Sequence, residues 1–168
     1  MKKIIYIIPG QGENCTLARY KVLAKVLAKK GFNVKKVNPD WYRPLSEQIF
    51  PVEKDAVIFG FSFGAVFTYL VAKKYPCKKV IFASLSPLHT FSQKSLIQDM
   101  CQYMSETLAS EIAVDFKHIK IQLTSLKVPY VCLAGQYEEG KGIAADFLVP
   151  KSGHRITPAY IKCIEKLV

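Results

Sequence analysis

Gly60-Phe61-Ser62-Phe63-Gly64 is the stretch that decides how the rest of the chain is interpreted. An apolar run, 56–59, leads into it, and a helix-like run, 65–74, leads out of it. A G-x-S-x-G pattern between a strand and a helix is typical of a sharp, strained turn that holds a serine hydroxyl at a helix N-terminus. The glycines let backbone pass close on both sides. The pattern therefore favours Ser62 as a nucleophile over a tight turn that merely contains a serine.

The remaining chain alternates between strand-like and helix-like segments. Apolar runs of strand length occur at 3–8, 32–37, 56–59, 79–84, 129–134 and 147–149. Apolar residues recur at helical spacing over 17–28, 65–74, 96–108 and 157–167, and we interpret the ambiguous stretch 111–126 as a helix. This alternation predicts an α/β fold, a three-layer αβα sandwich with a mostly parallel sheet of about six strands. With 168 residues and no linker or repeat, we expect one domain, 1–168.

Composition narrows the setting in which such a domain acts. No run approaches the roughly 20 apolar residues that span a bilayer. The N-terminal apolar run is too short for a signal sequence, so we expect a cytoplasmic protein without a transmembrane segment. The five cysteines are scattered and have no C-x-x-C spacing, which favours reduced thiols and no zinc site.

The net charge of +11 comes almost entirely from lysine. Such a charge could attract anionic lipid, nucleic acid or acidic substrates. The lysines, however, occur as scattered pairs near the ends of the predicted elements, without a long basic run. We therefore interpret them as a solvated surface and expect no nucleic-acid partner.

A serine nucleophile needs a base and a group that orients the base. Of the three histidines, His154 lies on a loop between the sixth predicted strand and the last helix, at the sheet edge where Ser62 is expected. An imidazole near neutral pH suits the removal of a serine proton. Glu138 and Glu139 follow the fifth predicted strand, at the same edge. We predict His154 as the base and Glu138 as its orienting carboxylate, with Glu139 as the alternative acid.

The oxyanion of an acyl-transfer intermediate needs backbone N–H donors. The Phe63 amide starts the helix after the serine, and loop 9–12 contains glycines that let its amides turn inward. We predict the Phe63 and Gln11 amides as the oxyanion hole. A phosphate-binding loop is not favoured at 9–12, because the third glycine of G-x-G-x-x-G and any G-K-[ST] are absent.

Together these segments resemble the α/β-hydrolase superfamily over nearly the whole chain. The resemblance rests on Pro-Gly-Gln-Gly after the first strand, Gly-Phe-Ser-Phe-Gly, an acid after Leu-Ala-Gly-Gln-Tyr, and Ser-Gly-His before the final helix. The order Ser62, Glu138, His154 matches that family's nucleophile–acid–histidine order and implies a catalytic triad. The N-terminal antiparallel strands and long cap insertions of the family are missing. The resemblance therefore implies a small, lidless member, in which one or two helices within 88–128 can overhang the site.

The function expected from these residues is a serine hydrolase that cleaves a carboxylic ester or thioester through an acyl-serine intermediate. Its partner is a small-molecule acyl ester or thioester, and no cofactor or metal is expected. The residues expected to contact substrate are Gly10, Trp41, Phe61 and Tyr137. Two alternatives stay open: an inactive binding or scaffold protein on the same fold, and an acyltransferase that uses an acceptor other than water.

Overall fold

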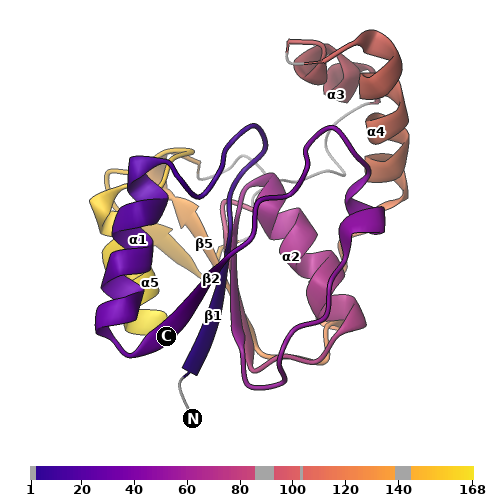
Figure 1. The fold of residues 1–168 in the computed structure, drawn as a ribbon. Coiled ribbons are helices and arrows are strands. Elements are labelled where there is room, and N and C mark those ends of the chain that lie inside the picture. The colour runs from indigo at the N-terminus through magenta and orange to yellow at the C-terminus, as the bar shows by residue number, and fades with distance from the viewer. Residues whose placement is uncertain (1–2, 86–92, 103, 139–144) are drawn as a thin grey trace.

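A computed structural model of the chain describes residues 3–85, 93–102, 104–138 and 145–168. Its centre is a six-stranded sheet with strand order β2-β1-β3-β4-β5-β6, in which every pair is parallel (Figure 1). The strands are β1 Lys3–Ile8, β2 Phe32–Lys36, β3 Val57–Phe61, β4 Lys79–Ala83, β5 Tyr130–Gly135 and β6 Phe147–Val149. The predicted sheet of about six mostly parallel strands is therefore confirmed.

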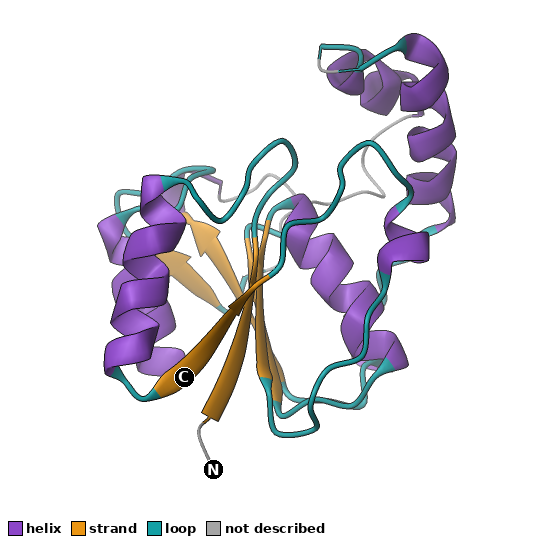
Figure 2. Cartoon of the chain, in the orientation of Figure 1, coloured by secondary structure: helices purple, strands orange, loops and turns teal. Residues whose placement is uncertain are grey.

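Helices cover both faces of the sheet (Figure 2). They are α1 Ala18–Lys29, α2 Phe63–Lys74, α3 Gln93–Met100, α4 Glu106–His118 and α5 Pro158–Leu167. Helices α1 and α5 pack on one face and α2 packs on the other, whereas α3 and α4 extend from the α2 side past the end of the sheet (Figure 1). The result is the three-layer αβα sandwich that the alternating segments predict.

The central strands are apolar on both sides because each side faces a different core. In β1, Ile5 and Ile7 point into the core beneath α1 and α5, whereas Tyr6 and Ile8 point into the core beneath α2. Successive side chains of a strand point to opposite faces of the sheet. A strand that is buried on both faces therefore has an uninterrupted apolar sequence. This is why the strand segments are visible in the sequence.

The strand order places a topological switch point between β1 and β3. The chain leaves β1 toward β2 on one side and continues from β3 toward β4 on the other. Loops that leave in opposite directions open a crevice at the carboxyl ends of the two strands, where ligands bind in open α/β sheets. The loop after β1 and the turn at Ser62 lie on the two sides of this crevice.

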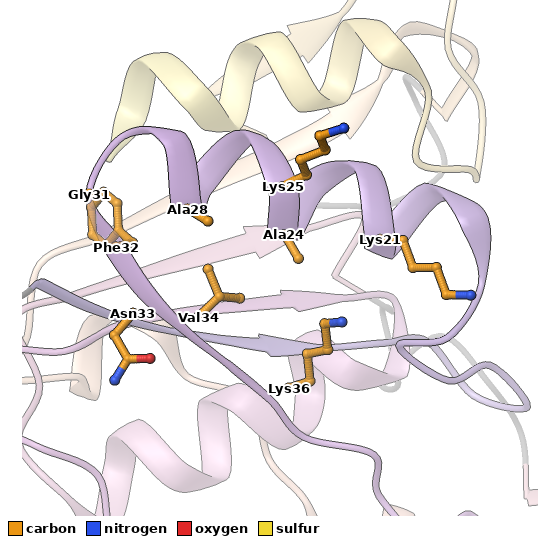
Figure 3. A pocket seen from close by; sticks show the side chains of 9 residues that line it. All are labelled: Lys21, Ala24, Lys25, Ala28, Gly31, Phe32, Asn33, Val34 and Lys36. Carbon is orange, nitrogen blue, oxygen red and sulfur yellow. The ribbon is translucent and has the colours of Figure 1, made fainter.

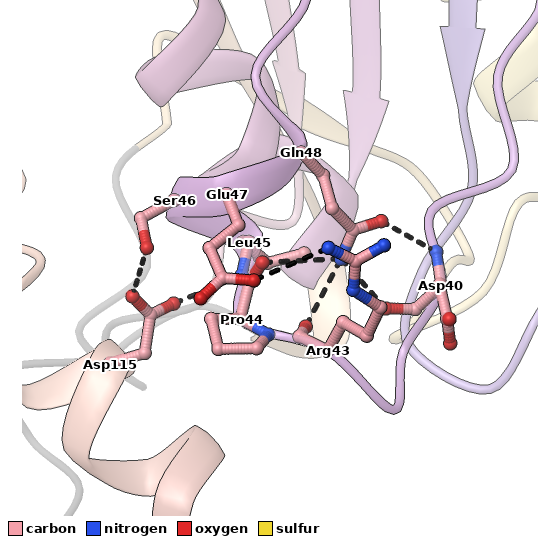
Figure 4. A network of polar contacts seen from close by, with 8 residues as sticks. All are labelled: Asp40, Arg43, Pro44, Leu45, Ser46, Glu47, Gln48 and Asp115. Carbon is pink, nitrogen blue, oxygen red and sulfur yellow. Dashed lines mark hydrogen bonds and ion pairs between the residues drawn. The ribbon is translucent and has the colours of Figure 1, made fainter.

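Helices α3 and α4 stand beyond the carboxyl edge of the sheet, on the α2 side (Figure 1). The 3-10 helix η1, Leu45–Gln48, ties α4 to the body of the protein through Asp115. The Asp115 carboxylate accepts from the Leu45 N–H at 3.0 Å and from the Ser46 hydroxyl at 2.5 Å (Figure 4). The helix pair is thus anchored beside the crevice through side-chain contacts made by α4.

The stretch 111–126 is not one helix, which corrects the sequence interpretation. Helix α4 ends at His118, and only a 3-10 turn, η3 Leu123–Ser125, follows. The Tyr69 hydroxyl donates to the Lys120 carbonyl at 3.1 Å and accepts from the Gln122 N–H at 3.2 Å. A buried side chain from α2 therefore satisfies backbone groups that a continued helix would have paired internally.

Basic residues line a cavity of about 670 Å³ between α1 and the edge strand β2 (Figure 3). Its lysines are Lys21, Lys25 and Lys36, and its apolar lining includes Ala24 and Val34.

No helix within the described ranges is both long enough and apolar enough to cross a bilayer. The same residues contain no group of three or more side chains arranged to hold a metal ion.

Candidate active site

Ser62 occupies a strained turn between β3 and α2. Its backbone has φ 55° and ψ −121°, a combination that non-glycine residues rarely adopt. The Ser62 N–H donates to the Ala83 carbonyl at 2.8 Å, which extends the pairing of β3 with β4 up to the turn. Strain of this kind persists only where the surroundings enforce it, and it clusters at functional sites. The turn places Ser62 directly before α2, so its hydroxyl lies at the N-terminus of that helix.

The two glycines of the pentapeptide are there because other atoms pass too close for a side chain. A Cβ at Gly60 would lie 2.2 Å from Thr68 Oγ1, and a Cβ at Gly64 would lie 2.0 Å from the Pro9 carbonyl oxygen. The second contact brings the loop after β1 against the first turn of α2. Gly64 therefore positions the serine and the candidate oxyanion loop side by side.

The three residues that the sequence predicts as a triad meet in the structure. His154 Nε2 lies 2.8 Å from Ser62 Oγ, and His154 Nδ1 lies 2.6 Å from Glu138 Oε1. They come from three different segments: the turn after β3, the 3-10 turn η4 Gln136–Glu138 after β5, and the loop after β6. The ring of Phe61 packs 5.1 Å from the imidazole, centroid to centroid. The imidazole thus bridges a hydroxyl and a carboxylate.

Glu138 is held by donors that sequence reasoning missed. Its carboxylate is 3% exposed and accepts from the Ser84 hydroxyl at 2.6 Å, the Gly135 N–H at 2.7 Å and the Tyr160 hydroxyl at 3.2 Å. Burial acts to raise the pKa of this carboxyl, but the hydrogen bonds from His154, Ser84 and Gly135 outweigh it and lower the pKa to about 2. Glu138 is therefore ionised at neutral pH.

A local signal for Ser84 did exist in the sequence. It directly follows β4 at the carboxyl edge, where a hydroxyl can donate to a carboxylate on a neighbouring loop. Tyr160 lies on the buried face of α5, where an aromatic reads as core. The other candidate acid, Glu139, lies outside the described residues.

The cavity in front of Ser62 has a volume of about 300 Å³. It is lined by Gly10, Gln11, Glu13, Phe61, Ser62, Phe63, Gln102 and His154. Within the described part of the chain, neither the Gln11 nor the Phe63 N–H has a hydrogen-bond acceptor. Two unpaired backbone donors at a cavity beside a serine are what an oxyanion would require. Gln102, between α3 and α4, reaches this cavity, so the helix pair borders the site.

Glu13 and Tyr20 organise the loop that carries Gln11, and the sequence analysis missed both. The Gly10 N–H donates to the Tyr20 hydroxyl at 3.1 Å, and that hydroxyl donates in turn to the Glu13 carboxylate. Arg19 pairs with the other oxygen of the same carboxylate. The Glu13 N–H closes the turn by donating to the Gly10 carbonyl at 3.0 Å. These bonds brace the turn on both sides of Gln11.

The four residues expected to contact substrate have different positions. Gly10 and Phe61 line the cavity with Ser62. Trp41 is buried and lines an adjoining cavity, not the cavity in front of Ser62. Tyr137 is 63% exposed and lies outside both cavities. The tertiary packing of the segment 38–42 decides the position of Trp41, and its own sequence pattern does not show it.

The low pKa of Glu138 predicts how stability depends on pH. A carboxyl whose pKa falls from 4.5 to about 2 on folding stabilises the protein above pH 4.5 and loses that contribution toward pH 2. We expect Glu138 to account for about 2 kcal/mol of the loss of unfolding free energy between about pH 6 and about pH 3. Urea unfolding of wild type and Glu138→Gln at both pH values measures this difference.

Glu111→Gln is the matched control for that experiment, because Glu111 is an exposed carboxylate on α4. It should follow the wild-type pH dependence. A loss of stability in Glu138→Gln as steep as in wild type would contradict the assigned hydrogen bonds.

Comparisons with solved structures identify the fold of the chain. No protein-family model matches the chain, and no curated protein sequence matches it. Est1E from Butyrivibrio proteoclasticus superposes with a TM-score of 0.65 at 12% identity, over 99% of this chain and 85% of that one. A lipase-esterase related protein from Clostridium acetobutylicum gives a TM-score of 0.63 at 13% identity, over 98% of this chain and 92% of that one. Alpha/beta hydrolase domain-containing protein 10 from mouse gives a TM-score of 0.61 at 14% identity, over 99% of this chain and 89% of that one. The chain therefore has the α/β-hydrolase fold, in a small form with six parallel strands.

Proposed function

We propose that the protein is a serine hydrolase that cleaves a carboxylic ester or thioester through an acyl-serine intermediate. One observation carries the proposal: the His154 imidazole bridges Ser62 Oγ at 2.8 Å and the buried Glu138 carboxylate at 2.6 Å. Nucleophile, base and orienting acid within hydrogen-bond reach define this chemistry by geometry, whatever the fold. The likeness to hydrolases of the same fold supports it.

The proton transfers of the reaction use side chains that already lie within hydrogen-bond distance of one another. Ser62 Oγ attacks the acyl carbon while His154 Nε2 takes its proton. Negative charge develops on the carbonyl oxygen, where the Gln11 and Phe63 amides can donate to it. The intermediate collapses, and the alcohol or thiol leaves with the proton from His154. Water then attacks the acyl-enzyme with His154 as base again, which releases the acid and restores Ser62.

Glu138 serves the base rather than the substrate. Because its Oε1 accepts from the Nδ1 side of the ring, Nε2 is left free to accept the serine proton. The charge of the carboxylate also stabilises the imidazolium that forms at each proton transfer. The cavity of about 300 Å³ fits a small acyl group better than a long lipid chain.

A fluorophosphonate probe tests the proposal directly, because it phosphonylates only an activated serine. We expect stoichiometric labelling of the wild type, mapped by mass spectrometry to the peptide that contains Ser62. Turnover of a panel of short acyl esters and thioesters should accompany it. A folded wild type that stays unlabelled, while a control hydrolase reacts, would exclude the activated nucleophile. Adding competing alcohols and amines and analysing the products separates hydrolysis from acyl transfer.

The brace around Gln11 gives a further prediction. Tyr20→Phe removes the hydroxyl that accepts from the Gly10 N–H and donates to Glu13. Loss of an oxyanion donor costs about 10²- to 10³-fold in kcat, so loosening one should cost about tenfold, with little change in KM. Steady-state kinetics on one short ester measures both constants.

Tyr69→Phe is the matched control, because Tyr69 is equally buried and also makes hydroxyl bonds to backbone, but under the other face of the sheet. It should lose a similar amount of stability and keep its kcat. Equal kcat values for the two variants would contradict the role of Tyr20.

A further inference from the structure

A second cavity adjoins the one in front of Ser62. It has a volume of about 310 Å³ and shares Gln11 and Glu13 with the first cavity as common walls. Its remaining walls come from the loop after β1, the segment that connects β2 to η1, and Met104 beside α4. A Cβ at Gly10 would lie 3.4 Å from both Glu13 Oε2 and Ser62 Cβ, so these two atoms lie within twice that distance of each other. A substrate that reacts at Ser62 can therefore extend past Glu13 into the second cavity.

The walls of the second cavity are held in place without a ligand. Trp41 Nε1 donates to the Glu13 carbonyl at 3.1 Å, which joins the two loops. The Gln48 side chain accepts from the Asp40 N–H at 2.8 Å and donates to the Asp40 carbonyl at 2.8 Å (Figure 4). The Asn38 side chain accepts from the Cys15 N–H at 2.7 Å. Such a preformed cavity needs little ordering when a ligand binds.

The lining of the two cavities favours an apolar arm without negative charge. Trp41, Tyr42 and Met104 supply large apolar or aromatic surface to the second cavity. Among the described lining residues, Glu13 and Asp40 are the only acids, and no lysine or arginine is present. This is notable in a chain with a net charge of +11. The Glu13 carboxylate is already paired with Arg19, which is not one of the lining residues. An anionic group placed here would therefore meet the Asp40 carboxylate and find no lysine or arginine in the lining to pair with.

We propose that the second cavity, bounded by Gln11, Glu13 and Trp41, is a subsite for the far arm of the substrate, and that this arm is apolar and uncharged. Substrates that carry a carboxylate or phosphate on that arm are rejected. The inference rests on the proposed hydrolase function, because it takes Ser62 as the point where the other end of the substrate reacts. It names the substrate class as a neutral ester or thioester with an arm that extends beyond the acyl centre.

Trp41 is the single tryptophan of the chain and lines this cavity, so all tryptophan fluorescence comes from a residue of the proposed subsite. We use Ser62→Ala, which leaves bound probes uncleaved, and three probes built on acetyl thioesters. Their thiol arms are methyl, 3,3-dimethylbutyl, and the same branched arm with a carboxylate in place of one methyl. A second set places these arms on the acyl side of S-methyl thioesters. We expect the neutral branched arm of one set to change the Trp41 emission at saturation, whereas the methyl and anionic arms do not.

Turnover by the unmutated enzyme gives an independent readout. Burying the branched arm should raise kcat/KM by about tenfold or more over the methyl arm, because each buried methylene contributes roughly fourfold. Tyr42→Ala should reduce this gain, whereas Tyr130→Ala, an exposed tyrosine at the amino end of β5, should retain it. Asp40→Lys should narrow the preference for the neutral over the anionic arm by about tenfold. Asp55→Lys makes the same charge change just before β3, at the opposite edge of the sheet, and should not narrow it.

The outcomes separate this inference from the proposed function. Equal rates for all arms in both probe sets, together with an unchanged Trp41 emission, overturn the subsite and leave the hydrolase intact. If Asp40→Lys and Asp55→Lys change the kcat/KM preference for the neutral over the anionic arm by the same factor, the charge selection is overturned. A Trp41 response to the neutral arm without turnover or fluorophosphonate labelling supports the subsite and overturns the hydrolase. Absence of labelling, turnover and any Trp41 response overturns both.

Discussion

Replacing Ser62 by alanine is expected to abolish turnover of every ester and thioester that the wild type cleaves, with a fall in kcat of about 10⁶-fold. The reason is that, among the residues that the structure describes, Ser62 carries the only hydroxyl that lines the cavity with His154. Ser84, a serine near the triad, is fully buried and donates to Glu138 at 2.6 Å, so it cannot reach an acyl carbon in the cavity. The residual rate would come from the oxyanion donors and substrate binding alone.

The measurement is kcat on the short-ester panel, with the circular dichroism melting curve of each variant. Ser62→Ala should unfold within about 1 kcal/mol of wild type, because it loses one hydrogen bond to a half-exposed imidazole. Ser125→Ala, which removes an exposed serine hydroxyl on η3, is the control and should keep full activity. A folded Ser62→Ala that retains most of its activity would show that Ser62 is not the nucleophile. If the cellular role also survives this substitution, the binding or scaffold function is favoured.

Glu138→Gln is expected to lower kcat by about 10⁴-fold, although the side chain keeps its size. The Gly135 N–H, 2.7 Å from Oε2, can only donate, so it holds the amide oxygen of the glutamine at that position. The amide NH₂ then occupies the place of Oε1, facing His154 Nδ1. Nδ1 must accept, and the remaining proton moves to Nε2. The imidazole would then present a donor to Ser62 and could not take its proton.

This tautomer argument distinguishes the expected result from a general loss of packing. Glu138→Asp removes one methylene and keeps the charge, so it should recover part of the activity that Glu138→Gln loses. Kinetics and melting curves of both variants are the measurement, together with Glu139→Gln. A fall of less than tenfold in Glu138→Gln, with a large fall in Glu139→Gln, would identify Glu139 as the acid.

Much of this arrangement could be predicted from the chain alone. The strands were visible because parallel strands buried on both faces are continuous apolar runs, as 3–8 and 79–84 show. Parallel strands also end at the same sheet edge, so residues that follow β3, β5 and β6 must come near one another. The meeting of Ser62, Glu138 and His154 follows from that rule, although their roles remain predictions.

The errors share a cause as well. The end of α4 at His118 depends on a Tyr69 hydroxyl that lies far away in sequence. The burial of Trp41 depends on a hydrogen bond to the Glu13 carbonyl across two loops. Neither contact leaves a periodic pattern in its own segment, so composition and spacing could not reveal it.

By itself, the sequence determined the order of the elements, the sheet edge where the candidate site lies and the residues that reach it. Local patterns suffice for this, because strand burial, turn strain and crossover direction act over a few residues at a time. Only the tertiary structure decided what surrounds those residues: the Ser84 and Tyr160 hydroxyls on Glu138, the Tyr20 brace and the cavity beside Trp41. These contacts join side chains from separate elements, and their geometry exists only once the layers have packed together.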